Sequence, residues 1–310
     1  MAESRTAIYA SIAGDLAVAA TKFAAAAVTN SSAMLSEGIH SVVDAANAAL
    51  LLFGINRSQQ PPDELHPFGH GQELYFWTLI VAIVIFGVGG GLSIYEGVDH
   101  ILRPKPLQSA FWNYVVLGAA ALFQGGASLV AFRQARDVVG ERGFIEAAHE
   151  TKDPTLFAVV LEDAAALGGL VVAFLGILIG HLLNEPRIDG GASIVIGLLL
   201  AAVAVFLIRE SRMLLVGESA DPALVAEVRR IAQADPAVDR VWPPLTLQHG
   251  PKNVLLNMEI QFRCGLSTAE LTSAIDRIER SVRRRFPVVQ QIFIEARSLA
   301  SAGPGDLPEG

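Results

Sequence analysis

The sequence of 310 residues predicts an α-helical membrane protein with six transmembrane helices and a small α+β domain at its C-terminal end. Two observations predict this fold class. Only 17% of the residues are charged, compared with about 25% in a typical soluble domain, and residues 1–209 consist of long apolar runs separated by short polar connections. Residues 210–297 have the composition of an ordinary soluble domain. The chain is therefore expected to form two domains.

Six segments are candidates for crossing a bilayer, because a crossing helix needs about 20 mainly apolar residues. The fourth is the weakest candidate, since Gln124, Gly125 and Gly126 interrupt it. The predicted spans are Thr6–Val28, Ala33–Ile55, Leu74–Val98, Phe111–Phe132, Thr155–Gly180 and Ile188–Ile208.

Basic residues in the short flanks of these spans predict the orientation. An even number of spans puts both termini on one side of the membrane, and Lys and Arg are more frequent on the cytoplasmic side. We therefore expect cytoplasmic N- and C-termini, and the compact chain favours a bacterial plasma membrane. The flanks on the side of the termini contain Arg5, Arg57, Arg133, Arg136, Arg142, Lys152, Arg209 and Arg212, and the opposite flanks contain Arg103, Lys105 and Arg187.

The C-terminal residues show the pattern of a small cytoplasmic α+β domain in the order α-β-β-α-β, which is a ferredoxin-like order. Cap residues and period-two alternation mark its elements. These elements are a helix from Pro222 to Ala234 with Asp221 as its cap, a strand around Val238–Gln248, a strand over Val254–Phe262, a helix to Arg285 that starts with a capping box of Ser267 and Glu270, and a strand over Val288–Glu295. Residues 298–310 are rich in Gly and Pro and are expected to form a disordered tail.

Composition and missing motifs exclude several classes of function. The net charge of −8 argues against nucleic acid as a partner. The single Cys264 excludes an intramolecular disulfide. An intramembrane metalloprotease usually carries H-E-x-x-H on a helix, and the sequence has no such run. A transporter is therefore favoured over an enzyme.

Ionisable residues lie inside two of the apolar spans. His40 and Asp44 are in the second span, and Glu162 and Asp163 are in the fifth. Each such residue costs at least about 2.5–3.5 kcal/mol to insert, so it normally faces the interior of the helix bundle and has a function. Imidazole and carboxylate groups are ligands of divalent transition metals. The pattern predicts a metal site within the membrane domain.

Spacing and depth support a shared site. His40 and Asp44 are four residues apart and lie on one helix face. A helix rises about 1.5 Å per residue. At that rise, the predicted depths of His40, Asp44 and Asp163 all fall near the middle of a hydrocarbon core about 30 Å thick. Glu162 and Asp163 differ in direction by about 100° on a helix, so both cannot face one ion equally. Asp163 is the predicted direct ligand, and Glu162 is a fourth ligand, a partner of His40 or a proton carrier.

Other polar residues have weaker patterns. Asp15 and Lys22 share a face of the first span but are about 10.5 Å apart, so each is expected to pair with another helix. Asp15 or Asn47 could instead line the path of the ion. In the loop after the second span, Asp63, His66 and His70 have the side-chain types of metal ligands at short spacing. That loop is either a second metal site or an ordinary polar loop.

Two motifs in this order resemble the cation diffusion facilitator family. They are Ser36-Glu-Gly-Ile-His40-Ser-Val-Val-Asp44 and His66-Pro-Phe-Gly-His70-Gly71, and together with the six spans and the α+β tail the resemblance covers about residues 5–297. Arg57, Asp153-Pro154 and Leu161-Glu-Asp163-Ala-Ala-Ala-Leu-Gly168 resemble the branch that contains the eukaryotic mitochondrial zinc transporter.

The resemblance implies a homodimer that exchanges a divalent cation, usually Zn²⁺, for H⁺ and usually exports it from the cytoplasm. The metal would be a substrate, and no prosthetic group is implied. The family places two ligands four residues apart on each of spans two and five, and here Val159 occupies one of the four positions. Asp63 and His66 fall on the loop metal site of the family. With only His249 and Glu295 as candidate ligands, the tail is expected to dimerise without a metal cluster.

Two alternatives remain open at the level of the sequence. The first is an antiporter of the same fold for Mn²⁺, Fe²⁺, Co²⁺ or Cd²⁺, because one His and up to three carboxylates also suit these ions. The second is a membrane protein that senses metal or binds a partner without transporting anything.

Overall fold

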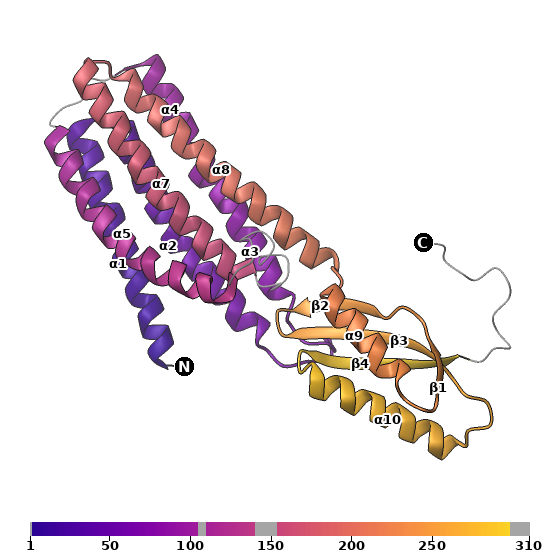
Figure 1. The fold of residues 1–310 in the computed structure, drawn as a ribbon. Helices are drawn as coiled ribbons and strands as arrows, with labels where there is room; N and C mark the ends of the chain where they lie inside the picture. Colours follow the sequence, from indigo (N-terminus) through magenta and orange to yellow (C-terminus); the bar gives the residue numbers. More distant parts are fainter. Residues whose placement is uncertain (1, 105–109, 140–153, 298–310) are drawn as a thin grey trace. The chain divides into compact units, whose positions relative to one another are not determined.

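The computed structural model describes residues 2–104, 110–139 and 154–297, and these residues form two compact units (Figure 1). One unit contains the long helices, and the other contains the loop Pro62–Gln72 together with the chain from Met213 onward. The long helices are α1 (Ala2–Thr29), α2 (Ser32–Ser58), α3 (Glu73–Val84), α4 (Leu92–Leu102), α5 (Ala110–Val139), α7 (Pro154–Leu183) and α8 (Arg187–Val216).

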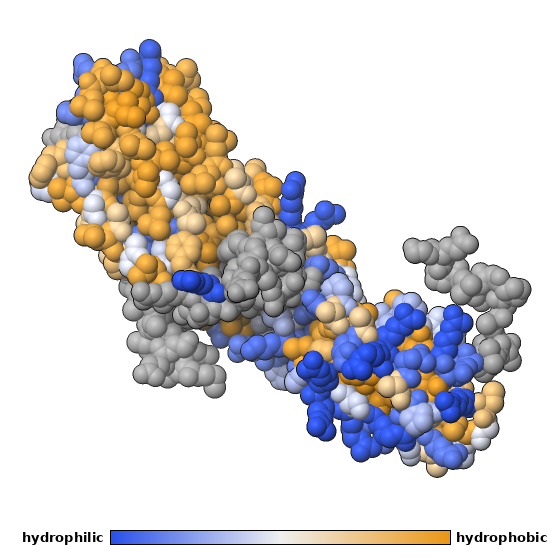
Figure 2. All heavy atoms as spheres, in the orientation of Figure 1, coloured by the Kyte–Doolittle hydropathy of each residue, from blue (hydrophilic) through white to orange (hydrophobic). Residues whose placement is uncertain are grey.

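These helices cover all six predicted apolar segments. Within the described part of the chain, four stretches are long and apolar enough to cross a membrane by length and composition: Ser32–Ser58, Glu73–Leu102, Phe157–Leu183 and Arg187–Val216. Apolar side chains dominate the visible surface of this helical unit, whereas polar side chains dominate that of the other unit (Figure 2). The membrane-helical class is therefore confirmed, and the count of six crossings stays a prediction for α1 and α5.

The third predicted span contains a π-helical segment that the sequence did not predict. A π-helix, η1 (Ile85–Gly91), joins α3 to α4. It is part of a contact between helices that glycines make possible: a Cβ atom on Gly90 would lie 3.0 Å from the carbonyl oxygen of Gly197 on α8. In the same way, a Cβ atom on Gly97 would lie 2.6 Å from the carbonyl oxygen of Gly190, also on α8. The missing side chains let the two helices approach closely, as small residues do in membrane bundles.

A buried carboxylate fixes the start of α2, the helix that carries His40 and Asp44. Asp189, at the start of α8, is fully buried, and its Oδ2 accepts hydrogen bonds from the backbone N–H groups of Ser32 (2.6 Å) and Ala33 (3.3 Å). The hydroxyl of Ser31 donates to Oδ1 of Asp189 at 2.7 Å. The first N–H groups of a helix have no partner within it, and a negative charge there is favourable. Asp189 supplies both the partner and the charge.

The second unit is a small α+β domain around β3. Its elements are α9 (Pro222–Gln233), β1 (Val238–Val241), β2 (Leu245–Gly250), β3 (Asn253–Phe262), α10 (Thr268–Arg285) and β4 (Val289–Arg297). Strands β1 and β2 pair antiparallel with the two halves of β3, and β4 pairs parallel with it. Alternate residues of β3 from Val254 to Ile260 are buried in one core with Ile278 and Val282 of α10. The α+β character is therefore confirmed.

One predicted strand is wrong in its extent. The sequence suggested a single strand around Val238–Gln248, but the structure has two strands, so that the order is α-β-β-β-α-β. The break falls at Pro243 and Pro244, which lack the N–H group that a sheet ladder requires.

The predicted caps of this domain are confirmed. Asp221 accepts from the backbone N–H of Ala223 at 2.7 Å at the start of α9, and Ser267 forms the capping box with Glu270 at the start of α10. The expected disordered tail at residues 298–310 lies outside the described residues.

Candidate metal centres

His40 and Asp44 lie together on α2, as their spacing predicted. Nδ1 of His40 is 3.4 Å from Oδ1 of Asp44, and their side chains are 3% and 22% exposed. Neither ring nitrogen of His40 has a hydrogen-bond partner among the described residues, and neither does Oδ1 of Asp44. An unpaired buried polar atom costs about 1–3 kcal/mol, and a bound cation would remove that cost at these three atoms. The donor set of one imidazole and one carboxylate suits a divalent transition metal.

The two acidic residues of α7 are held by different helices. The side-chain amide of Asn47, on α2, donates to Oε1 of Glu162 at 3.0 Å. That of Gln124, on α5, donates to Oδ1 of Asp163 at 3.0 Å. Neighbouring residues on a helix point in different directions, and here Glu162 reaches the helix of His40 and Asp44, whereas Asp163 reaches α5.

The helix residues are not gathered as tightly as ligands around one ion. Within the residues that the structure describes, no set of three from His40, Asp44, Glu162 and Asp163 has ligand atoms all within 4.8 Å of one another. The predicted intramembrane ligand set therefore stays a prediction. A single ion bound by all of them requires a closer approach of α2 and α7, or new side-chain rotamers.

Lys22 pairs with a residue to which the sequence analysis gave no role. Its ammonium group is buried and lies 2.9 Å from Oε2 of Glu37 and 2.9 Å from the hydroxyl of Ser41, both on α2. The expectation that Lys22 pairs with another helix is confirmed. Asp15 is half-buried on α1, within electrostatic range of Asp163 and Lys22.

Glu37 and Gln124 are the residues that sequence reasoning missed. The signal was present, because each is a polar residue inside an apolar span. What the sequence could not give was the partner, since Lys22 and Asp163 lie 15 and 39 positions away along the chain.

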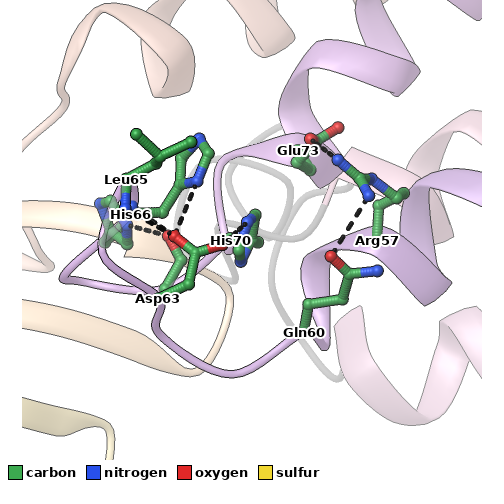
Figure 3. A network of polar contacts seen from close by, with 9 residues as sticks. Arg57, Gln60, Asp63, Leu65, His66, His70 and Glu73 are labelled. Carbon is green, nitrogen blue, oxygen red and sulfur yellow. Dashed lines mark hydrogen bonds and ion pairs between the residues drawn. The ribbon is translucent and has the colours of Figure 1, made fainter.

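The loop Pro62–Gln72 brings together the three predicted ligands Asp63, His66 and His70 (Figure 3). Each offers a ligand atom within 4.8 Å of the others. Oδ1 of Asp63 is 3.2 Å from Nδ1 of His66, and Oδ2 is 3.4 Å from Nε2 of His70. The imidazole of His70 is 4% exposed, whereas the side chains of the other two are 51% exposed. One carboxylate and two imidazoles form a donor set that fits Zn²⁺ and leaves a fourth position open.

A tight turn holds Asp63 in place. Its Oδ1 accepts hydrogen bonds from the backbone N–H groups of Leu65 (3.0 Å) and His66 (2.6 Å) (Figure 3). The bond from the backbone of His66 is the main reason that the pKa of Asp63 lies below its ordinary value, and the neighbouring imidazoles act in the same direction. The carboxylate is therefore ionised, as a metal ligand must be, well into the acidic range.

The loop is packed against the sheet of the same unit. The ring of Phe68 meets the rings of His249 and Phe293 edge to face, with centroids 6.2 and 6.4 Å away. Nε2 of His249 is 3.3 Å from the carbonyl oxygen of Gly69. The side-chain amide of Asn253 donates a hydrogen bond to the carbonyl oxygen of Phe68 at 3.3 Å. His249, a candidate tail ligand, is therefore used to hold the loop.

Arg57 and Glu73 lie at the two ends of this loop. Arg57, near the end of α2, is 3.2 Å from Oε1 of Glu73 at the start of α3 (Figure 3). The indole of Trp77 donates to the other carboxylate oxygen of Glu73 at 2.9 Å. These contacts join the two helices from which the loop emerges.

Comparison with known proteins assigns the family. Residues 8–216 match the model of the cation efflux transmembrane domain. The chain therefore belongs to the cation efflux, or cation diffusion facilitator, family, whose members are membrane transporters rather than classical enzymes. The family that the sequence motifs suggested is confirmed.

The relatives include proteins named for zinc and for manganese. The mitochondrial proton-coupled zinc antiporter SLC30A9 of Xenopus laevis is 35% identical over 76% of this chain and 42% of its own length. Metal tolerance protein C4 of Arabidopsis thaliana is 29% identical over 91% of this chain and 71% of its own length. The manganese efflux system protein MneP of Bacillus subtilis is 24% identical over 86% of each chain. The chain spans less than half the length of SLC30A9.

Replacing Phe68 with Ala should release the loop Pro62–Gln72 from the sheet. Phe68 is 40% exposed, so the loss of its buried part should cost about 1–2 kcal/mol, and amide hydrogens of residues 62–72 should exchange about tenfold faster. Hydrogen exchange read by mass spectrometry measures this. Leu65→Ala is the control, because Leu65 is 86% exposed and should leave the exchange unchanged. Equal protection in both variants would contradict the docking.

Proposed function

We propose that this chain is a secondary transporter that exchanges a divalent transition-metal cation, Zn²⁺ in the first place, for protons. The observation that carries the proposal is the pair of buried His40 and partly buried Asp44 on an apolar helix. Both ring nitrogens of His40 and Oδ1 of Asp44 are buried without a hydrogen-bond partner among the described residues, and Glu162 of α7 is held beside the same helix. Membership of the family and the zinc antiporters among its relatives support the same activity.

Competition between metal and protons couples the two fluxes. Imidazole and carboxylate groups bind a metal only when they are deprotonated, so an arriving cation displaces protons and a departing cation lets them return. A difference of one pH unit supplies about 1.4 kcal/mol per proton, which supports a roughly tenfold gradient of metal per proton exchanged. Alternating exposure of the site to the two sides requires α2 and α7 to move relative to their neighbours.

The contacts support Glu162 more directly than Asp163 as the ligand from α7. Glu162 is hydrogen-bonded to a residue of α2, whereas Asp163 is hydrogen-bonded to a residue of α5. We therefore propose His40, Asp44 and Glu162 as the core of the site, with Asp163 as the fourth ligand. This reverses the preference that the sequence suggested, and Asp15 and Asn47 remain candidates for the path of the ion.

We further propose that the loop residues Asp63, His66 and His70 bind a second metal ion. One ligand atom from each of the three residues lies within 4.8 Å of the other two.

The proposal also includes a homodimer with cytoplasmic termini in a bacterial plasma membrane, and export from the cytoplasm as the direction of transport. Zinc is preferred because both sites contain imidazole. The manganese efflux protein among the relatives keeps Mn²⁺ as the alternative cargo.

Asp44→Ala should abolish metal transport, because it removes a charged ligand from the buried site. The measurement is uptake of Zn²⁺, Mn²⁺, Co²⁺ or Cd²⁺ into liposomes that contain the purified protein, a pH gradient and a trapped metal-sensitive dye. Asp99→Ala is the control, since Asp99 lies near the end of α4 and pairs with the exposed Arg103. Transport by Asp44→Ala at the rate of the parent would refute the site. A folded parent protein that carries no metal would favour the alternative in which the protein senses metal or binds a partner without transporting anything.

The two carboxylates of α7 can be separated by conservative amide substitutions. We expect Glu162→Gln to reduce the initial rate of Zn²⁺ uptake at least as much as Asp163→Asn, because Glu162 already faces α2. Both substitutions preserve side-chain size, so folded protein in detergent should remain comparable. An active Glu162→Gln beside an inactive Asp163→Asn would restore Asp163 as the principal ligand.

The loop site should add one bound metal per chain that does not depend on the intramembrane residues. His66→Ala and Asp63→Asn should each remove it from a zinc titration followed by calorimetry, and Asp44→Ala should retain it. Asn keeps an oxygen that can accept the turn hydrogen bonds, so Asp63→Asn tests charge rather than the turn. Because the pKa of Asp63 lies below its ordinary value, this carboxylate should stay ionised and able to bind the metal in mild acid. Unchanged stoichiometry in both loop variants would exclude the site.

A further inference from the structure

Asn47 lies on the same face of α2 as the two proposed ligands. It follows Asp44 by three residues and His40 by seven, so the three side chains are stacked along one side of the helix. Its side chain is fully buried. A buried amide in a membrane helix is unfavourable unless its polar atoms find partners, and the partner of Asn47 is the carboxylate of Glu162.

The hydrogen bond has a defined polarity. Only the NH₂ group of an amide can donate to a carboxylate, so Nδ2 of Asn47 faces Oε1 of Glu162, at 3.0 Å. The other amide atom, Oδ1, is buried and has no hydrogen-bond partner among the described residues. An ionised carboxylate can accept about four hydrogen bonds or metal contacts. Glu162 can therefore keep its bond to Asn47 and bind a cation at the same time.

The contrast with the next residue of α7 shows what this bond does. Asp163 receives an equivalent bond from Gln124, but that amide belongs to α5. Two amides on two helices thus draw consecutive carboxylates in different directions. Without Asn47, nothing else among the described hydrogen bonds ties Glu162 to the helix of His40 and Asp44.

We propose that Asn47 is a positioning residue that turns Glu162 toward His40 and Asp44 and so presets the metal site. This inference rests on the proposed transport function. Partners that orient ligating carboxylates typically change metal affinity 10–100-fold when they are removed. The amide is neutral, so it orients the carboxylate without adding a charge that would repel the cation.

Asn47→Leu tests the role, because leucine is similar in size and cannot donate. We expect the Zn²⁺ concentration at half-maximal uptake to rise about 10–100-fold, with a smaller change in maximal rate. Asn113→Leu is the matched control. Asn113 is also fully buried in a long helix, and its Oδ1 accepts from the hydroxyl of Thr29 at 2.7 Å. Its loss should lower stability and leave the half-maximal concentration unchanged.

A double-mutant cycle identifies the route of the effect. If Asn47 acts through Glu162, then Asn47→Leu should have little further effect on zinc affinity once Glu162→Gln is present. An equal loss of affinity with and without Glu162, or an unchanged affinity in folded Asn47→Leu protein, would overturn the proposal. If Asn47→Leu fails to fold, Asn47→Ser provides the same test, since serine is too short to reach the carboxylate.

Failure of this inference can be told apart from failure of the proposed function. Zinc calorimetry on the same variants, each carrying His66→Ala to remove the proposed loop site, reads the affinity of the intramembrane site without transport. A parent protein that binds zinc but carries none overturns the transport function, and the binding data then decide the role of Asn47. A parent that neither binds nor carries Zn²⁺, Mn²⁺, Co²⁺ or Cd²⁺ overturns both.

Discussion

The cost of an unpaired polar group in a membrane helix is the constraint on which this structure depends. Several polar groups of the helical unit meet it with a partner on another helix: Lys22 binds Glu37, and Asp189 binds the first N–H groups of α2. At His40 and Asp44, the two ring nitrogens and Oδ1 of the carboxylate are among the buried polar atoms that have no hydrogen-bond partner in the described residues. A bound cation would supply that partner, so the same energy that makes the pair unfavourable alone gives the site its affinity.

Helix α2 is the element through which these interactions combine. Asp189 of α8 fixes its first turn, Lys22 of α1 binds its Glu37, and Glu37 in turn packs directly against Gly169 of α7. Two of the proposed ligands, His40 and Asp44, follow Glu37 within two turns of the same helix. A movement of α2 therefore changes contacts with three other helices together, which is the behaviour required of an element that exposes a site alternately to two sides.

The loop Pro62–Gln72, which carries the candidate ligands Asp63, His66 and His70, is packed against the sheet of the C-terminal domain. Phe68, His249 and Phe293 fix the loop backbone against the sheet. Any metal that prefers the docked loop must, by linkage, also strengthen the docking. Metal binding at the proposed loop site would thus be thermodynamically coupled to docking of the loop. The sheet would contribute ring contacts and hydrogen bonds to the loop backbone rather than a ligand.

The sequence by itself determined the apolar helices, the α+β tail with its caps, and the residue types of both candidate sites, because these depend on local composition and on spacing along one helix or loop. It misjudged the strand around Val238–Gln248, where Pro243 and Pro244 interrupt the ladder, and it missed the π-helix at Ile85–Gly91. Only the tertiary structure decided that Glu162 faces α2 while Asp163 faces α5. Helical periodicity fixes the angle between neighbouring side chains, but the helix that each one meets depends on how separate segments pack.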